Sequence, residues 1–206
     1  ADGDRLMIYA ETMAIDLALM QVTKYLVQRP RPYAYNPSAA AKAYTRAAGD
    51  DARLSFYSGH AAMSFGAAVS GAYLLGASEV HPNIRMLAWG MGMATAATTA
   101  NLRVRAGKHF YSDVVIGAAV GIAVGYLVPA LHATDAPYSP SAGELAMGGV
   151  GLLVGMLGSE LIPLGNADEH ERERGTGLLG RLGIDRVGLA PMTLPSGAGL
   201  ALAGSL

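Results

Sequence analysis

The chain has 206 residues and a formal net charge of −1, from 15 Lys and Arg residues against 16 Asp and Glu residues. A charge near zero gives no bulk attraction to nucleic acid, so we expect no nucleic-acid partner. The absence of cysteine excludes a disulfide scaffold, a thiolate metal site and a cysteine nucleophile. Charged residues make up only 15% of the chain, which disfavours disorder and coiled coil.

Apolar residues at helical spacing predict a first helix over residues 4–28. It ends at Arg29-Pro30-Arg31-Pro32, because a proline and the residue before it do not continue a helix. A long connection follows over residues 33–57, with a short helix expected at 39–48. A connection of this length inside a compact domain is usually functional.

Four uncharged stretches predict further helices over residues 61–78, 86–102, 114–131 and 145–159, with a turn at His81-Pro82-Asn83. Small residues recur at every fourth position in the last two of them: Gly117, Gly121, Gly125 and Gly151, Gly155, Ser159. This spacing lets helix backbones approach each other closely. The predicted fold class is therefore all-α, a compact up-down bundle of about five or six helices.

The end of the chain differs from the helical part. Residues 168–174 (DEHERER) mix both signs of charge, which is typical of a solvated face. Residues 187–206 alternate weakly around Pro195-Ser196-Gly197, which predicts a short C-terminal β-hairpin. We expect a helical domain over residues 1–165 and, over residues 166–206, a charged linker and small-residue tail packed on the same domain.

The relation of the helices to a membrane has two alternatives. Helices of 17 or 18 residues reach the lower limit for crossing a bilayer, and 114–131 would insert most readily. However, 61–78 and 86–102 are largely Ala, Gly, Ser and Thr, which gain little from hydrocarbon. We therefore expect a soluble or peripheral bundle, with membrane insertion as the alternative. The lack of cysteine fits a location in the cell envelope, periplasmic or extracytoplasmic.

Helices that alternate in direction bring four segments to one end of the bundle. These segments are residues 24–32, 58–60, the loop 102–110 and the following helix start at Asp113. They hold six of the fifteen Lys and Arg residues and two of the five histidines, His60 and His109. Arginine and lysine bind phosphate oxygens, and backbone N–H groups at a helix start add to this. The segments therefore predict an anion site.

Two histidines in such a site can divide the roles of nucleophile and general acid. Asp113 lies one helical turn after His109, so it can hold one ring nitrogen and leave the other free to attack. The sequence has no acidic cluster and no His-x-x-x-His pair, so we expect no metal and no resident cofactor.

Three motifs at this end resemble those of the type 2 phosphatidic acid phosphatase superfamily, which includes vanadium haloperoxidases. The matched residues are Lys24, Arg31 and Pro32 in KYLVQRPRP, Ser58, Gly59 and His60 in FYSGH, and Arg103, His109 and Asp113 in LRVRAGKHFYSD. The resemblance covers about residues 5–131, and its motifs agree in order and separation. Tyr57 and Leu102 stand where the family usually has Pro and Ser.

The resemblance implies a metal-independent phosphatase that hydrolyses a phosphate monoester, such as a lipid phosphate or a related envelope substrate. His109 would form a phosphohistidine, Asp113 would orient it, and His60 would protonate the leaving alcohol. The remaining matched residues would hold the phosphoryl oxygens: Lys24, Arg31, Ser58, Gly59 and Arg103. The other two arginines of this end, Arg29 and Arg105, are expected to be rim charges or supports.

Two other functions are alternatives. The family implies that vanadate could occupy the phosphate site, so a vanadium-dependent haloperoxidase is one of them. The other is a non-catalytic helical membrane or scaffold protein, which the intact set of His60, His109 and Asp113 disfavours. The sequence gives no oligomeric state.

Overall fold

The computed structural model describes residues 2–134, 136–164, 186–194 and 197–205. Contacts divide the chain into two units, Ala1–Met156 and Leu157–Leu206. The first unit holds most of the predicted bundle and all the predicted site residues. The charged run at 168–174 lies outside the described residues, so the expectation that a tail from residue 166 packs on the helical domain stays a prediction.

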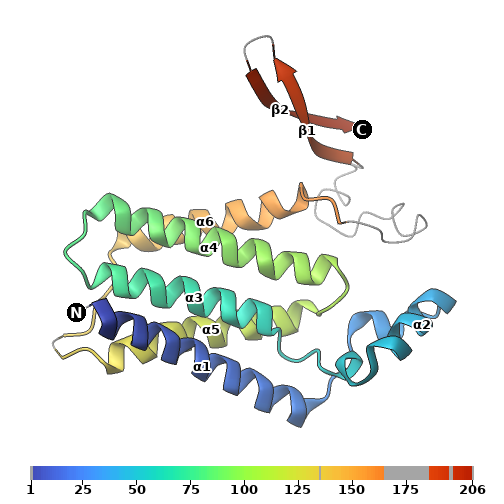
Figure 1. Cartoon of the computed structure of the whole chain (residues 1–206), viewed down its shortest axis with the longest axis horizontal. Helices are drawn as coiled ribbons and strands as arrows, with labels where there is room; N and C mark the ends of the chain where they lie inside the picture. Colours follow the sequence, from blue (N-terminus) through green and yellow to red (C-terminus); the bar gives the residue numbers. More distant parts are fainter. Residues whose placement is uncertain (1, 135, 165–185, 195–196, 206) are drawn as a thin grey trace. The chain divides into compact units, whose positions relative to one another are not determined.

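The described residues form six α-helices: α1 (Asp2–Val27), α2 (Ala39–Ala48), α3 (Gly59–Gly76), α4 (Pro82–Arg105), α5 (Tyr111–Leu131) and α6 (Ala142–Glu160). Two short 3-10 helices, η1 (Pro32–Tyr35) and η2 (Gly49–Arg53), flank α2. In Figure 1, α1, α3, α4 and α5 lie alongside one another, and α3 contacts the other three. The predicted all-α bundle is confirmed.

A two-stranded antiparallel sheet follows in the second unit. Its strands are β1 (Arg186–Leu194) and β2 (Gly197–Ser205), with Arg186 opposite Ser205 and Leu194 opposite Gly197. This is the hairpin that the sequence predicts, and its turn residues 195–196 lie outside the described residues.

Local signals set where the helices begin and end. The side chain of Ser38 accepts a hydrogen bond from Ala41 N at 3.1 Å and caps α2. His81 caps α4 in the same way, so Pro82 and Asn83 form its first turn rather than the predicted interhelical turn. Gln28 follows α1 with a φ of +46°, a left-handed conformation that turns the chain out of the helix.

Glycines bring the helices close together, as their spacing predicts. Gly117, Gly121 and Gly125 of α5 face backbone carbonyls of α3, and a Cβ on Gly117 would lie 2.5 Å from the Ser58 oxygen. Gly151 of α6 faces the carbonyl of Gly90 in α4 in the same manner. The larger core side chains, among them Phe65 and Trp89, fill the space around these contacts.

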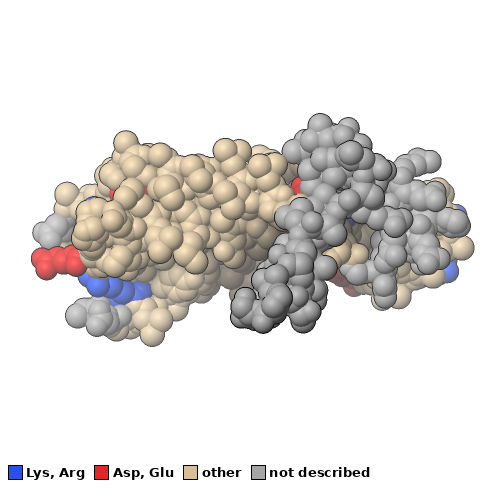
Figure 2. Space-filling view, turned by 90° about the horizontal axis from the view of Figure 1, so that it is seen from above, with Lys and Arg blue, Asp and Glu red and all other residues tan. Residues whose placement is uncertain are grey.

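Three helical segments of the described chain are long and apolar enough to cross a membrane: Gly3–Tyr35, Tyr111–Leu131 and Ala142–Glu160. Their outer faces carry exposed apolar side chains, such as Leu26, Leu127 and Leu153. Figure 2 shows the middle of the helical unit free of Lys, Arg, Asp and Glu on the face in view, with charges near its ends. The chain therefore has the surface of a membrane-associated protein, which moves the balance away from the expected soluble bundle.

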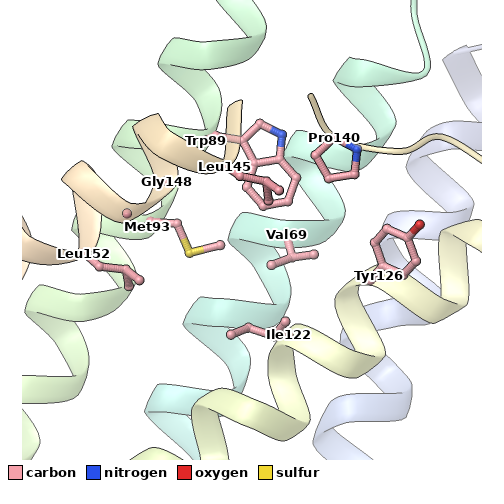
Figure 3. Close-up of a pocket in the computed structure, with 10 residues that line it drawn as sticks. Val69, Trp89, Met93, Ile122, Tyr126, Pro140, Leu145, Gly148 and Leu152 are labelled. Atoms are coloured by element: carbon pink, nitrogen blue, oxygen red, sulfur yellow. The ribbon is translucent and has the colours of Figure 1, made fainter. Parts of the chain in front are cut away.

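A cavity of about 340 Å³ lies among α3, α4, α5 and α6 (Figure 3). Its lining is apolar or aromatic and includes Val69, Trp89 and Ile122. None of the predicted site residues lines it. The cavity is therefore separate from the predicted site residues Ser58, Gly59 and His60, which lie at the start of α3.

Candidate active site

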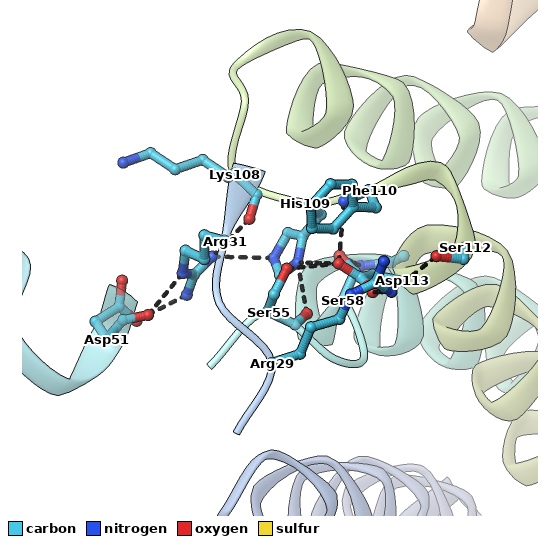
Figure 4. Close-up of polar contacts among 11 residues, drawn as sticks. Arg29, Arg31, Asp51, Ser55, Ser58, Lys108, His109, Phe110, Ser112 and Asp113 are labelled. Atoms are coloured by element: carbon cyan, nitrogen blue, oxygen red, sulfur yellow. Dashed lines mark hydrogen bonds and ion pairs between the residues drawn. The ribbon is translucent and has the colours of Figure 1, made fainter. Parts of the chain in front are cut away.

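Hydrogen bonds join the four segments that the sequence predicts to meet. The backbone N–H of Ser58, at the start of α3, donates to the carbonyl of Asp113 in α5 at 3.0 Å. Nη1 of Arg31, which follows α1, donates to the carbonyl of Lys108 in the α4–α5 loop at 3.1 Å. Figure 4 shows these residues clustered around His109. The predicted convergence at one end of the bundle is therefore present.

His109 is held in one orientation and one tautomer. Its Nδ1 lies 2.8 Å from the backbone carbonyl oxygen of Ser55, which can only accept a hydrogen bond. The proton of a neutral ring must therefore sit on Nδ1, and Nε2 carries a lone pair. That lone pair faces Nη1 of Arg31 at 3.3 Å. The nitrogen available to attack a phosphorus atom is thus Nε2.

The surroundings keep His109 neutral. The side chain is buried, with 2% of its surface exposed. Burial lowers the pKa of His109 to about 3, and the nearby charges of Arg31 and Arg103 act in the same direction, against the hydrogen bond to Ser55 and the charge of Asp113. A neutral imidazole is the form that can act as a nucleophile, so His109 is competent at ordinary pH.

Asp113 does not hold His109 directly, contrary to expectation. The distance from His109 Nδ1 to Asp113 Oδ2 is 3.8 Å, which is too long for a hydrogen bond. The carboxylate instead accepts from Ser55 Oγ at 2.5 Å and the Phe110 N–H at 3.0 Å on Oδ2, and from Arg29 Nη1 at 2.6 Å on Oδ1. Asp113 therefore binds Ser55, and the carbonyl of Ser55 accepts the hydrogen bond from Nδ1–H of His109.

Arg31 is nine-tenths or more buried and most of its donors already have protein partners. Nε donates to the Asp51 carbonyl at 2.8 Å, and Nη2 pairs with the Asp51 carboxylate at 2.7 Å. Nη1 is shared between Lys108 O and His109 Nε2. Nη1 of the planar guanidinium thereby faces Nε2 of His109, and a phosphoryl group on Nε2 would lie against Nη1.

The other predicted cations surround the same place. Lys24 lies in the last turn of α1 and Arg103 in the last turn of α4. Nε of Arg103 is buried without a hydrogen-bond partner, so it offers an anion a donor that the protein leaves unused. Desolvation lowers the pKa of His60, and the charges of Arg103, Lys24 and Arg31 lower it further. His60 therefore lies close enough to these three cations to interact with them electrostatically.

Ser58 and Gly59 form the start of α3, directly before His60. The hydroxyl of Ser58 caps the helix by accepting from Ala61 N at 3.4 Å, and the residue is fully buried. Gly59 packs against Met20, and a Cβ there would lie 3.0 Å from three Met20 atoms. The helix start therefore has its N–H groups beside the cations, where the helix dipole favours an anion.

Three contacts in this site were not predicted. Ser55 supplies a backbone carbonyl, a group that every residue has, so no side-chain pattern could reveal its role. Asp51, which lies in the 33–57 connection, binds Arg31. The length of that connection was the only sequence signal that indicated a functional role for it. Arg29, expected as a rim charge or support, pairs with Asp113 and stacks on the Phe110 ring at 4.2 Å from the ring centre.

Comparison with known proteins gives one family. Curated proteins and solved structures yield no match. A family model described as the PAP2 superfamily matches residues 5–136, the stretch that contains every motif residue described above. That match covers more than half of the chain and implies phosphoryl transfer of the phosphatase or haloperoxidase type. The chain belongs to the PAP2 superfamily.

Proposed function

We propose that this protein is a metal-independent phosphatase that hydrolyses a phosphate monoester through a phosphohistidine on His109. The observation that carries the proposal is the state of His109: buried, neutral, with Nδ1 bound to the Ser55 carbonyl and Nε2 facing a guanidinium. A histidine that only fills the core has no need of an arginine at its unprotonated nitrogen. A histidine that receives a dianionic phosphoryl group there needs a cation beside that nitrogen to stabilise the charge.

In the first step Nε2 of His109 attacks phosphorus and the bond from phosphorus to the ester oxygen breaks. His60 donates a proton to the leaving alcohol oxygen. Lys24, Arg31 and Arg103, with the Ser58 hydroxyl and the N–H of Gly59, hold the three equatorial oxygens. Their charges stabilise the negative charge on those oxygens, which is the main requirement of phosphoryl transfer.

In the second step water attacks the phosphohistidine and the bond from phosphorus to Nε2 breaks. His60, now neutral, takes a proton from that water, and inorganic phosphate leaves. His109 returns to its starting tautomer because Nδ1 keeps its proton throughout. Among the described residues no three acidic, His or Cys side chains gather into a metal site, and the cations supply the charge that a metal supplies elsewhere.

The proposed substrate class is a lipid phosphate or a related ester of the cell envelope. The apolar outer faces of α1, α5 and α6 support it, because a membrane-associated enzyme meets its substrate at the lipid surface. We place the protein in the envelope with its active site on the extracytoplasmic side. A membrane surface is then its partner, beside the substrate.

A trapped phosphoenzyme tests the mechanism. Purified protein in detergent is mixed with a ³²P-labelled lipid phosphate, quenched with base and analysed for acid-labile, base-stable label. We expect label in wild type and in His60→Ala, which keeps the nucleophile, and none in His109→Ala. General acid catalysis is worth about 10²–10⁴-fold, so His60→Ala loses that much turnover with an alkyl phosphate and less with a nitrophenyl ester.

Two results would overturn the proposal. Label that persists in His109→Ala and disappears in His60→Ala would exchange the two roles. Turnover abolished by EDTA and restored by Mg²⁺ would remove the metal-independent mechanism. Vanadate is expected to inhibit, and halide oxidation by peroxide in its presence, without phosphatase activity, would favour the haloperoxidase.

A further inference from the structure

Arg29 is not among the residues proposed to hold phosphate, and its side chain has other partners. Nη1 donates to Asp113 Oδ1 at 2.6 Å and to Ser112 Oγ at 2.9 Å, and the guanidinium carbon lies 4.2 Å from the centre of the Phe110 ring. All three partners belong to the start of α5 (Figure 4). The side chain therefore clamps the first turn of the helix that follows the nucleophile.

Ser55 connects this clamp to the nucleophile. Its hydroxyl donates to Asp113 Oδ2 at 2.5 Å, and its carbonyl accepts from Nδ1 of His109 at 2.8 Å. Its own N–H donates to the carbonyl of Arg29 at 3.0 Å. The backbone N–H of Ser55 is thus bound to Arg29, and its hydroxyl is bound to Asp113, which is itself bound to Arg29.

We propose that Arg29 and Ser55 are positioning residues of the phosphoryl-transfer site: Arg29 fixes Asp113, and Asp113 fixes Ser55, whose carbonyl keeps the proton on Nδ1 of His109. The reason lies in the alternatives open to the aspartate. With its Oδ1 bound to Arg29 and its Oδ2 bound to Ser55, the carboxylate stays 3.8 Å from the imidazole. Without them it is free to accept the hydrogen bond from Nδ1–H itself and to draw the ring away from Arg31.

Burial supports a positioning role for the pair. The side chains of Asp113 and Ser55 are fully buried, while that of Arg29 is 34% exposed. A buried carboxylate needs every partner it has, because loss of one leaves an unpaired charge. Arg29 reaches it from a chain turn made by Gln28, whose φ of +46° is a conformation that only surrounding contacts maintain.

The inference rests on the proposed function for its kinetic test and is independent of it for its spectroscopic test. We expect Arg29→Met to lower kcat by about 10–100-fold with little change in KM, because positioning rather than phosphate binding is lost. Methionine keeps a contact with the Phe110 ring. Ser55→Ala is expected to act in the same direction. Arg46→Met, which removes an exposed arginine of α2, is the matched control and should leave kcat unchanged.

A double-mutant cycle shows whether Arg29 acts through Asp113. In an Asp113→Asn background the further change of Arg29→Met should cost less than twofold, since the carboxylate that Arg29 orders is gone. The same 10–100-fold loss in both backgrounds would overturn the inference. A rise in KM, or in the inhibition constant of inorganic phosphate, with kcat unchanged would overturn it as well and make Arg29 a phosphate ligand.

The tautomer of His109 is measured without turnover. Protein labelled with ¹⁵N in its histidines is compared by NMR, with His109→Gln used for assignment. Wild type should show Nδ1 protonated and Nε2 unprotonated. Arg29→Met and Ser55→Ala should keep this tautomer but shift the Nδ1–H proton resonance downfield, because its acceptor changes from the Ser55 carbonyl to the Asp113 carboxylate. An unchanged Nδ1–H resonance in both Arg29→Met and Ser55→Ala would overturn the inference even in an active enzyme. If wild type hydrolyses no phosphate ester, the proposed function fails while this measurement still decides the positioning role.

Discussion

The two histidines of the site differ in environment, and this difference supports the roles proposed for them. His109 is buried against a carbonyl and an arginine, and its pKa falls to about 3. His60 is the second residue of α3 and is exposed, with a pKa lowered by desolvation and by three cations. A group that stays neutral suits a nucleophile, and one that can still gain a proton suits a general acid.

The pH dependence of kcat/KM follows from the state of His60. A general acid must be protonated in the free enzyme, and the pKa of His60 is lowered below its usual 6.5. For an alkyl phosphate, kcat/KM should therefore fall as pH rises through that lowered value. In the complex a dianionic phosphoryl group raises the pKa of His60, so the fall of kcat should occur at higher pH.

Rate profiles from pH 4 to 9 check this, with His60→Gln as the control. The substrate phosphate itself titrates near pH 6, and that contribution remains in the variant while the one from His60 disappears. Identical profiles for wild type and His60→Gln would contradict the assignment of the general acid.

A single backbone angle also yields a prediction. Gln28 has a φ of +46°, which costs an L-residue about 1–2 kcal/mol and glycine nothing. Gln28→Gly should therefore match or exceed the stability of wild type, whereas Gln28→Val should lower it by about 1–2 kcal/mol, since a branched Cβ crowds this conformation most. Denaturant unfolding in detergent measures both. A more stable valine variant would contradict the left-handed turn.

At the scale of the elements, the contact between α3 and α5 decides the shape of the site. Gly117, Gly121 and Gly125 bring the two backbones together. Because the first of these glycines lies against the Ser58 carbonyl, the same contact sets the start of α3 against the start of α5. The start of α3, proposed to bind phosphate, and the helix that carries Asp113 are therefore joined by packing as well as by a hydrogen bond.

Replacing Gly121 with alanine tests this packing. A Cβ there would overlap the Ala62 carbonyl, which is backbone and cannot move aside. We expect Gly121→Ala to destabilise by about 1–3 kcal/mol, the usual cost of overpacking. Gly149→Ala is the matched control, because nothing lies within 4 Å of its added Cβ and helix propensity then favours alanine by about 1 kcal/mol. Opposite shifts of the thermal midpoint are expected, and equal shifts would contradict the close approach.

At the scale of the whole molecule, exposed apolar surface is the dominant feature. Large side chains such as Leu26, Leu127 and Leu131 are more than half exposed on helices that are long enough to cross a bilayer. A soluble protein of this size rarely exposes so many large apolar side chains on its helices. The proposed active site lies at one end of these helices, where charged residues gather, and a site at the membrane–water interface would lie there.

Cell fractionation tests the membrane location. The full chain should sediment with membranes and remain there after an alkaline carbonate wash, because hydrocarbon rather than charge holds it. Release by the wash would indicate a peripheral protein, and recovery in the soluble fraction without detergent would contradict membrane association. A soluble protein of similar size, expressed beside it, controls for trapping in vesicles.

The helices, the convergence of their ends and the family could all be predicted from the sequence. Periodicity, prolines and small-residue spacing are local properties, and the short helix at 39–48 matches α2 residue for residue. Lys24, His60 and His109 could be proposed as site residues for a similar reason, since their side-chain chemistry is a property of the residues themselves.

The contacts that hold His109 could not be predicted in this way, because they depend on how the helices and loops pack. The sequence suggested Asp113 as its direct partner because the two are one helical turn apart, yet the carboxylate is taken by Ser55 and Arg29 and stays 3.8 Å away. The acceptor for Nδ1 is instead a backbone carbonyl 54 residues earlier in the chain. Every residue has a carbonyl, so its role depends on where the chain passes, and that path is set by the packing of helices rather than by the identity of the residue.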